Sequence, residues 1–178
     1  MNGIHKIAGE SYHRLYARVH GMHTVALRLT NTFGPRMRVI DARQTFLGAW
    51  IRAAVEARPF EVWGGGQLRD FTYVDDAVDA LIAAARLPGS GVYNLGGDRV
   101  ISLRATADLL AAISGGGYVV REFPADRVRI DIGDYYADDG AFRAASGWAP
   151  RVALEEGLRR TVDYYRRHLH RYVQDPGR

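Results

Sequence analysis

The sequence predicts an α/β fold, and two observations support this. Segments with apolar residues at helical spacing alternate with short runs rich in β-branched and aromatic residues, without an internal repeat or a low-complexity tract. The chain has 178 residues, of which 47% are hydrophobic and 25% charged. This length is enough for one sizeable core and too short for two full domains.

Each element follows from periodicity and from glycine or proline at its ends. Ser102 is the expected N-cap of its helix, because a serine hydroxyl accepts from an unpaired N–H of the first turn. The expected helices cover residues 4–19, 46–55, 74–87, 102–113, 139–145 and 154–173. The expected strands cover residues 24–29, 60–63, 91–95 and 118–123, with loops over 31–35 and from Gly64 through Arg69.

Several protein classes are excluded or disfavoured by composition. No apolar run approaches the roughly 20 residues that cross a bilayer, and no basic and apolar leader is visible. The absence of cysteine excludes disulfides and thiolate metal sites and fits a cytoplasmic protein. No carboxylate–histidine group with metal-ligand spacing appears either, so no bound metal is expected. The net charge of +4 is best explained by a solvated basic helix over 159–171, so no nucleic-acid partner is expected.

Lysine usage singles out one position. Of the 24 basic residues, 23 are arginine, and Lys6 is the only lysine. An ammonium group is a compact point charge with rotatable donors, so Lys6 is expected where a planar guanidinium would not serve.

Several spaced motifs occur in order along the chain. They are Asn2-Gly3-Ile4-His5-Lys6 with Glu10, Arg28-Leu29-Thr30-Asn31-Thr32-Phe33-Gly34-Pro35, Phe60-Glu61-Val62-Trp63-Gly64, Arg69-Asp70-Phe71-Thr72-Tyr73-Val74-Asp75-Asp76 and Arg127-Val128-Arg129-Ile130-Asp131. Their order and spacing resemble the extended short-chain dehydrogenases, the NAD-dependent epimerases and dehydratases of nucleotide sugars. Gly147-Trp148-Ala149-Pro150 and the segment from Leu154 to Leu158 resemble motifs that pack the family's last helix. The resemblance covers the whole chain and implies the C-terminal part of a Rossmann-type fold with a small substrate-binding domain.

The resemblance assigns catalytic and cofactor-binding roles near the N-terminus. Lys6 matches the lysine that binds the nicotinamide ribose, and Leu29 and Thr30 match backbone that faces NAD. Asn2 stands where the family has its catalytic tyrosine. An amide has no proton to exchange near neutral pH, so Asn2 cannot replace a phenolate as general base.

The resemblance also assigns the substrate site, for a UDP- or dTDP-linked sugar. Arg69 is expected on the diphosphate, because a guanidinium matches phosphate oxygens; the alternative is an ion pair with Asp70 or Asp75. The other implied substrate-binding residues are Asn31, Thr45, Phe46, Trp63, Arg127, Arg129 and Asp131, and the choice between Arg127 and Arg129 stays open.

The resemblance also implies how the chain divides. Residues 1–35 are expected to be a remnant of the dinucleotide-binding domain, and residues 36–178 mainly the substrate-binding domain with segments that return to the Rossmann sheet. No glycine-rich dinucleotide loop is present, so about 130 to 150 further N-terminal residues are expected in an intact protein. A cloned fragment, a misassigned start codon and a truncated gene are all open explanations.

Two interpretations of function remain. The first is the substrate-binding portion of an NAD-dependent epimerase or dehydratase, inactive alone and binding NAD only in the intact protein. The second is a non-catalytic nucleotide-sugar-binding or interaction module, a relic in which Asn2 marks lost chemistry. In either case the apolar faces of the first helix and strand lack cover, so a homo-oligomer is expected.

Overall fold

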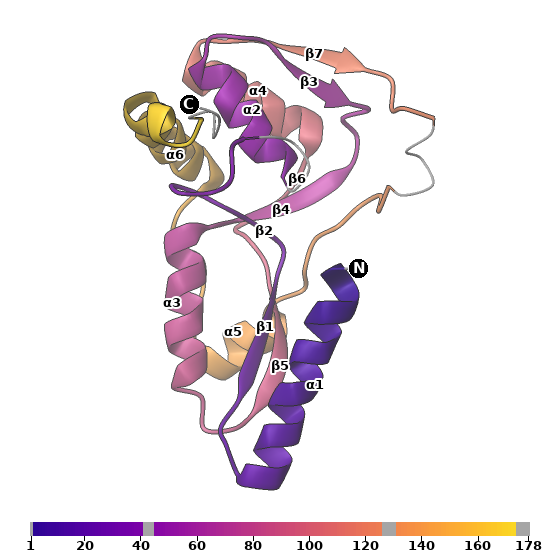
Figure 1. Cartoon of the computed structure of the whole chain (residues 1–178), viewed down its shortest axis with the longest axis vertical. Helices are drawn as coiled ribbons and strands as arrows, with labels where there is room; N and C mark the ends of the chain where they lie inside the picture. The colour runs from indigo at the N-terminus through magenta and orange to yellow at the C-terminus, as the bar shows by residue number, and fades with distance from the viewer. Residues whose placement is uncertain (1, 41–44, 126–130, 174–178) are drawn as a thin grey trace.

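The computed structural model describes residues 2–40, 45–125 and 131–173, which form two lobes (Figure 1). The helices are α1 (Asn2–His20), α2 (Phe46–Val55), α3 (Val74–Ala85), α4 (Leu103–Ser114), α5 (Gly140–Ser146) and α6 (Leu154–His168), followed by a 3-10 turn (Leu169–Arg171). The strands are β1 (Val25–Leu29), β2 (Asn31–Phe33), β3 (Phe60–Trp63), β4 (Leu68–Tyr73), β5 (Gly91–Leu95), β6 (Val100–Ser102) and β7 (Tyr118–Arg121).

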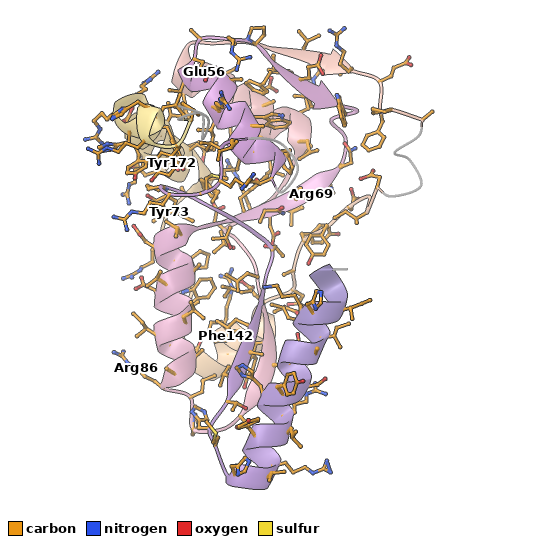
Figure 2. All side chains as sticks on the ribbon, viewed as in Figure 1. Glu56, Arg69, Tyr73, Arg86, Phe142 and Tyr172 are labelled. Atoms are coloured by element: carbon orange, nitrogen blue, oxygen red, sulfur yellow. The ribbon has the colours of Figure 1, made fainter. Side chains whose placement is uncertain are left out.

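The lower lobe is built on the parallel pair β1–β5, which runs in register from Val25 opposite Gly91 to Leu29 opposite Leu95. Figure 1 shows α1 and α3 on either side of this pair, with α5 behind it. The alanine-rich face of α3 packs close to the strands, and Phe142 of α5 is fully buried beneath them (Figure 2). Its core is small and consists of Ala80, Ala84, Leu87, Leu95, Phe142 and Trp148.

The upper lobe holds the larger core. Strand β4 lies between β2, which is parallel to it, and β6, which is antiparallel, while β3 pairs in parallel with β7. Helices α2, α4 and α6 pack together against these strands. Apolar side chains from all three helices meet the strands here, including Leu47, Ile51, Phe60, Phe71, Leu110, Leu158 and Val162.

The α/β prediction is confirmed, as are all six helices to within a few residues, except that the last one ends early. Helix α6 stops at His168, and a 3-10 turn over Leu169–Arg171 follows it. Ser102 caps α4 as expected, its hydroxyl accepting from the N–H of Ala105 at 3.1 Å.

The predicted loops were wrong at two places, and a third strand was missed. Residues 31–33 and 68–73 are strands, because each finds a partner far away in the sequence: Asn31 lies opposite Phe71 and Phe33 opposite Tyr73. Strand β6 then closes the other edge of β4, with Arg69 opposite Ile101. Turn-forming and charged residues mask these strands in the sequence, and non-local pairing decides the structure.

Three arginines of α6 are paired with acids on the same helix. Glu156 accepts from Arg159 and Arg160, and Asp163 accepts from Arg166 at 3.3 Å. This arrangement fits the solvated helix face expected from the sequence, whereas the absence of a nucleic-acid partner stays a prediction.

Helix α1 presents a largely uncovered apolar face. Six large apolar side chains along it are between 48% and 70% exposed, namely Ile4, Ile7, Tyr12, Leu15, Tyr16 and Val19. The helix touches β1 but few other elements in the described chain. A surface of this kind on a soluble protein generally marks an interaction site.

Candidate functional site

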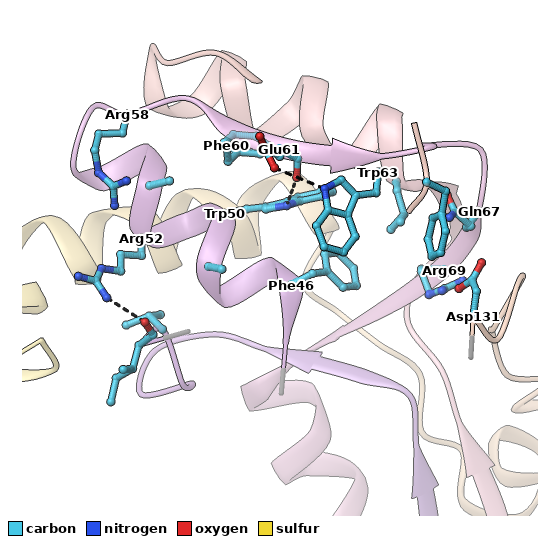
Figure 3. Close-up of a pocket in the computed structure, with 16 residues that line it drawn as sticks. Phe46, Trp50, Arg52, Arg58, Phe60, Glu61, Trp63, Gln67, Arg69 and Asp131 are labelled. Carbon is cyan, nitrogen blue, oxygen red and sulfur yellow. Dashed lines mark hydrogen bonds between the residues drawn. The ribbon is translucent and has the colours of Figure 1, made fainter. Parts of the chain in front are cut away.

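A pocket of about 610 Å³ opens in the upper lobe between α2, β3 and the start of β4 (Figure 3). Its volume lies within the range of small-molecule sites. The residues that line it are Val39, Ile40, Phe46, Ala49, Trp50, Arg52, Ala53, Arg58, Phe60, Glu61, Trp63, Gln67, Arg69, Leu103, Phe123 and Asp131.

Aromatic rings make up much of the pocket wall. Phe46 meets Trp50 edge-on at 4.9 Å between ring centroids, and Trp50 stacks on Phe60 at 5.1 Å. The indole N–H of Trp50 donates to the carbonyl of Glu61 at 2.9 Å, which fixes α2 against β3. Trp63 meets Phe123 edge-on at 6.3 Å. Such a wall suits a flat ring such as a nucleobase.

The position of α2 depends on one glycine and one cap. A Cβ on Gly48 would lie 2.1 Å from the carbonyl oxygen of Arg38, so only glycine lets the helix pack this close to the preceding loop. Thr45 caps the helix by accepting from the N–H of Gly48 at 3.5 Å. Thr45 therefore has a structural contact, whereas Phe46 behind it reaches the pocket.

Arg69 stands at one end of the pocket and is only 6% exposed. Its Nη1 donates to the carbonyls of Leu68, at 2.7 Å, and Gly133. Among the described residues it forms no ion pair with Asp70 or Asp75, so that alternative is wrong. Asp131 lines the same end (Figure 3). In general a guanidinium can donate paired hydrogen bonds to an anionic oxygen pair.

The opposite end of the pocket carries two further guanidiniums. Arg52 and Arg58 both donate to the carboxylate of Glu56, at 2.9 Å and 3.0 Å from their Nε atoms. Burial alone would raise the pKa of Glu56, but the hydrogen bonds from Arg58 and Arg52 outweigh it and hold that pKa below its ordinary value. The negative charge of Glu56 therefore offsets part of the positive charge of Arg52 and Arg58 at this end of the pocket.

Residues predicted near the cofactor lie at the carboxyl end of β1. Leu29 is 37% exposed there, and the N–H of Thr30 donates to the carbonyl of Leu95 at 3.3 Å. Asn31 does not line the pocket; its Nδ2 donates to the main-chain carbonyl of Asp70 at 3.0 Å.

Lys6 is exposed on the N-terminal half of α1, the end of the helix that faces the junction of the lobes (Figure 1). The side chain of Asn2 lies outside the described residues, as do Arg127 and Arg129. The structure thus brings Phe46, Trp63, Arg69 and Asp131 to one pocket, and it leaves Lys6, Leu29, Thr30, Asn31 and Thr45 outside its lining.

Sequence reasoning missed several pocket residues. Trp50 was assigned to a helix by periodicity, with no sign that it also faces a cavity, whereas Phe60 lies in the motif that the resemblance places beside the nucleobase. Gln67 lies just before β4 and Phe123 two residues beyond the end of β7, and no motif marked either of them. The unusual aromatic density between positions 46 and 63 was the available signal.

Among the described residues, no group of three or more histidine, cysteine or acidic side chains is placed to hold a metal ion. No described helix is long and apolar enough to cross a membrane. The cytoplasmic location stays a prediction.

Known proteins resemble this chain over most of its length. UDP-glucuronic acid decarboxylase 1 of Xenopus tropicalis is 32% identical over 155 residues, 86% of this chain and 36% of that protein. The structure of UDP-glucose 4-epimerase from Thermotoga maritima with UDP-glucose matches with a TM-score of 0.80 and 29% identity, covering 94% of this chain and 53% of that one. UDP-glucuronic acid 4-epimerase from Bacillus cereus with NAD matches with a TM-score of 0.78 and 26% identity, covering 98% and 52%.

The chain therefore spans between about a third and about half of the length of these relatives. The family model of the NAD dependent epimerase/dehydratase family matches residues 3–96, more than half of the chain. The parallel strands and flanking helices of this chain agree with the Rossmann-like structures of these epimerases. The chain belongs to the NAD dependent epimerase/dehydratase family.

Proposed function

We propose that this chain is the substrate-binding portion of an NAD-dependent nucleotide-sugar epimerase or dehydratase, and that its ligand is a UDP- or dTDP-linked sugar. The observation that carries this proposal is the buried guanidinium of Arg69 at the end of an aromatic pocket. A base on the aromatic wall and a diphosphate on Arg69 would use both features. The relative from Thermotoga maritima was solved with UDP-glucose, which supports a ligand of this class.

The division of the chain follows from this proposal. Residues 1–35 would belong to the dinucleotide-binding domain, and 36–178 mainly to the substrate-binding domain. Strand β5 is the segment expected to return to the Rossmann sheet, and its parallel pairing with β1 supports that assignment.

NAD is proposed as the cofactor of the intact protein. Ligands of parallel α/β sheets bind beyond the carboxyl ends of the strands, where Leu29 is partly exposed. Lys6 is also accessible at the junction-facing end of α1, so these positions fit a cofactor. Lys6 would bind the nicotinamide ribose of NAD, and NAD when bound would supply the acceptor for a hydride from the sugar. The sequence contains no glycine-rich phosphate loop, so tight binding by this chain alone is not expected.

Catalysis by this chain alone is not expected. Asn2 cannot act as the general base that the family's tyrosine provides. One site must also hold cofactor and sugar within hydride-transfer distance. Asn2 favours a second candidate function, a non-catalytic nucleotide-sugar-binding or interaction module, whereas the retained Lys6 and Arg69 favour the first.

Calorimetric titration of the chain with UDP, UDP-glucose, dTDP-glucose and NAD tests the proposal. We expect heat of binding from at least one uridine or thymidine ligand and none from NAD. If neither sugar nucleotide nor UDP binds, the chain does not contain a working substrate site. A second test compares turnover of Asn2 and Asn2→Tyr forms of a longer protein that includes a dinucleotide-binding domain. Turnover gained by Asn2→Tyr favours the enzyme, and no turnover in either form favours the non-catalytic module.

We also propose that the chain forms a homo-oligomer through α1. The exposed apolar face of this helix and the free edge of β1 in the described sheet both support association.

A further inference from the structure

Asp70 is a buried carboxylate at the junction of the two lobes. It is 2% exposed, and its Oδ2 accepts from the N–H of Ala137 at 3.1 Å and of Gly97 at 3.4 Å. Its Oδ1 is buried without a hydrogen-bond partner among the described residues. A buried polar atom in this state is uncommon in a native protein and calls for an explanation.

The groups that Asp70 holds come from three separate crossings between the lobes. Gly97 follows β5 of the lower lobe, and Ala137 lies on the segment that leads from the pocket to α5. The main-chain carbonyl of Asp70 accepts from the side chain of Asn31, which follows β1. One residue of β4 therefore ties together the chain leaving β1, the chain leaving β5 and the chain entering α5.

Two glycines make this contact possible. A Cβ on Gly96 would lie 2.6 Å from Oδ2 of Asp70, and a Cβ on Gly97 would lie 2.1 Å from the carbonyl oxygen of Phe71. Any side chain at these positions would push the loop away from β4 and lengthen the hydrogen bond to Asp70.

The same region of β4 holds the pocket segment, residues 131–137. Leu68 accepts from the N–H of Tyr135 at 3.0 Å and donates to Oδ1 of Asp134 at 2.8 Å. Arg69 donates to the carbonyl of Gly133. These bonds fix the segment beside Arg69, with Asp131 facing the pocket, and the bond from Ala137 to Asp70 fixes its far end.

We propose that Asp70 is a positioning residue of the nucleotide site: by holding Gly97 and Ala137 it sets where Arg69 and Asp131 stand relative to the carboxyl ends of β1 and β5. This inference rests on the proposed nucleotide-binding function. Asp70 does not line the pocket and acts through the backbone of its neighbours. Both bonds use one oxygen, so an amide at this position can keep them, whereas a methyl group cannot.

Calorimetric titration of UDP into the whole chain and three variants tests the proposal. Asp70→Asn is expected to bind UDP within about threefold of the wild type, because its carbonyl oxygen still accepts from both amides. Asp70→Ala and Gly96→Ala are expected to bind on the order of tenfold more weakly or worse, because a small displacement of positioned groups has a large effect. Val162→Ala, a core change on α6 outside the contacts of Asp70, controls for loss of stability and should leave the affinity unchanged.

Amide hydrogen exchange of the wild-type chain gives a second measurement that does not depend on a variant folding. UDP is expected to slow exchange at Gly97 and Ala137 as well as around Arg69. Unchanged exchange at Gly97 and Ala137 in the presence of bound UDP would overturn the proposal. The proposal would also be overturned if Asp70→Ala bound UDP as tightly as the wild type. It would be overturned too if Asp70→Asn and Asp70→Ala lost the same amount of affinity for UDP. If the wild type binds no nucleotide at all, the proposed function fails as well, so the two failures are distinguishable.

Discussion

The carboxylate of Glu10 on α1 accepts two hydrogen bonds from the guanidinium of Arg28 on β1, each at 2.7 Å. The two residues belong to separate motifs in the sequence, one around Lys6 and one ending at Pro35. The fold brings these two motifs side by side through this contact. The bidentate pair joins the helix to the end of the strand that leads into the lobe junction.

Glu10→Gln should lower the melting temperature slightly at neutral pH. The hydrogen bond from Arg28 lowers the pKa of Glu10 below its ordinary value of 4.5. A lowered pKa in the folded state adds stability above pH 4.5, and this contribution disappears as the pH falls through the lower folded value. The melting temperatures of wild type and variant should therefore converge in acid.

Thermal unfolding between pH 7 and pH 3 measures this difference, which should be small because Arg28 is largely exposed and screened by salt. Glu122→Gln is the matched control, since Glu122 is exposed and has no ion pair in the described structure. A gap between wild type and Glu10→Gln that stays constant down to pH 3 would contradict the pairing.

Arg69→Gln should weaken UDP binding by about tenfold or more, because a charge-assisted hydrogen bond to an anion contributes on the order of 1.5–3 kcal/mol. Calorimetry measures this. Arg86→Gln removes the same charge from the far end of the lower lobe (Figure 2) and should bind like the wild type. If both variants lose affinity equally, long-range charge rather than contact explains the binding.

The helices and part of the pocket could be predicted from the sequence, for different reasons. Apolar spacing located α2, and the resemblance pointed to Phe46, Trp63 and Arg69, which do meet in one pocket. Trp50 escaped notice because a helical aromatic looks the same whether it faces a core or a cavity. Strand β4 escaped because Arg69 and Asp70 are charged, and only the pairing with β2 and β6 makes this segment a buried strand.

Two glycine substitutions should change stability in opposite directions. Gly9→Ala lies in α1 with open space around its Cβ position, so it should stabilise by up to about 1 kcal/mol through helix propensity. Gly157→Ala in α6 would place its Cβ 2.7 Å from Phe33 and 2.9 Å from Tyr73. Overpacking should outweigh propensity and destabilise the fold by about 1–3 kcal/mol.

Urea denaturation gives both free energies of unfolding. The pair acts as its own control, because the same substitution is made within a helix in each case. Stabilisation by Gly157→Ala would mean that α6 does not pack against Phe33 and Tyr73 as closely as the structure shows.

Leu15→Glu should abolish self-association. Leu15 is 52% exposed near the middle of the apolar face of α1, between Tyr12 and Val19. A carboxylate there would lose its hydration if a second copy covered the face, and burial of an unpaired charge is strongly unfavourable. Sedimentation equilibrium should therefore show an oligomer for the wild type and a monomer for the variant. Arg86→Glu, a charge change at the end of α3 and not on α1, is the control, and it should stay associated. A monomeric wild type at micromolar concentration would rule out the proposed interface, and an oligomer that survives Leu15→Glu would move it to another surface, such as the free edge of β1.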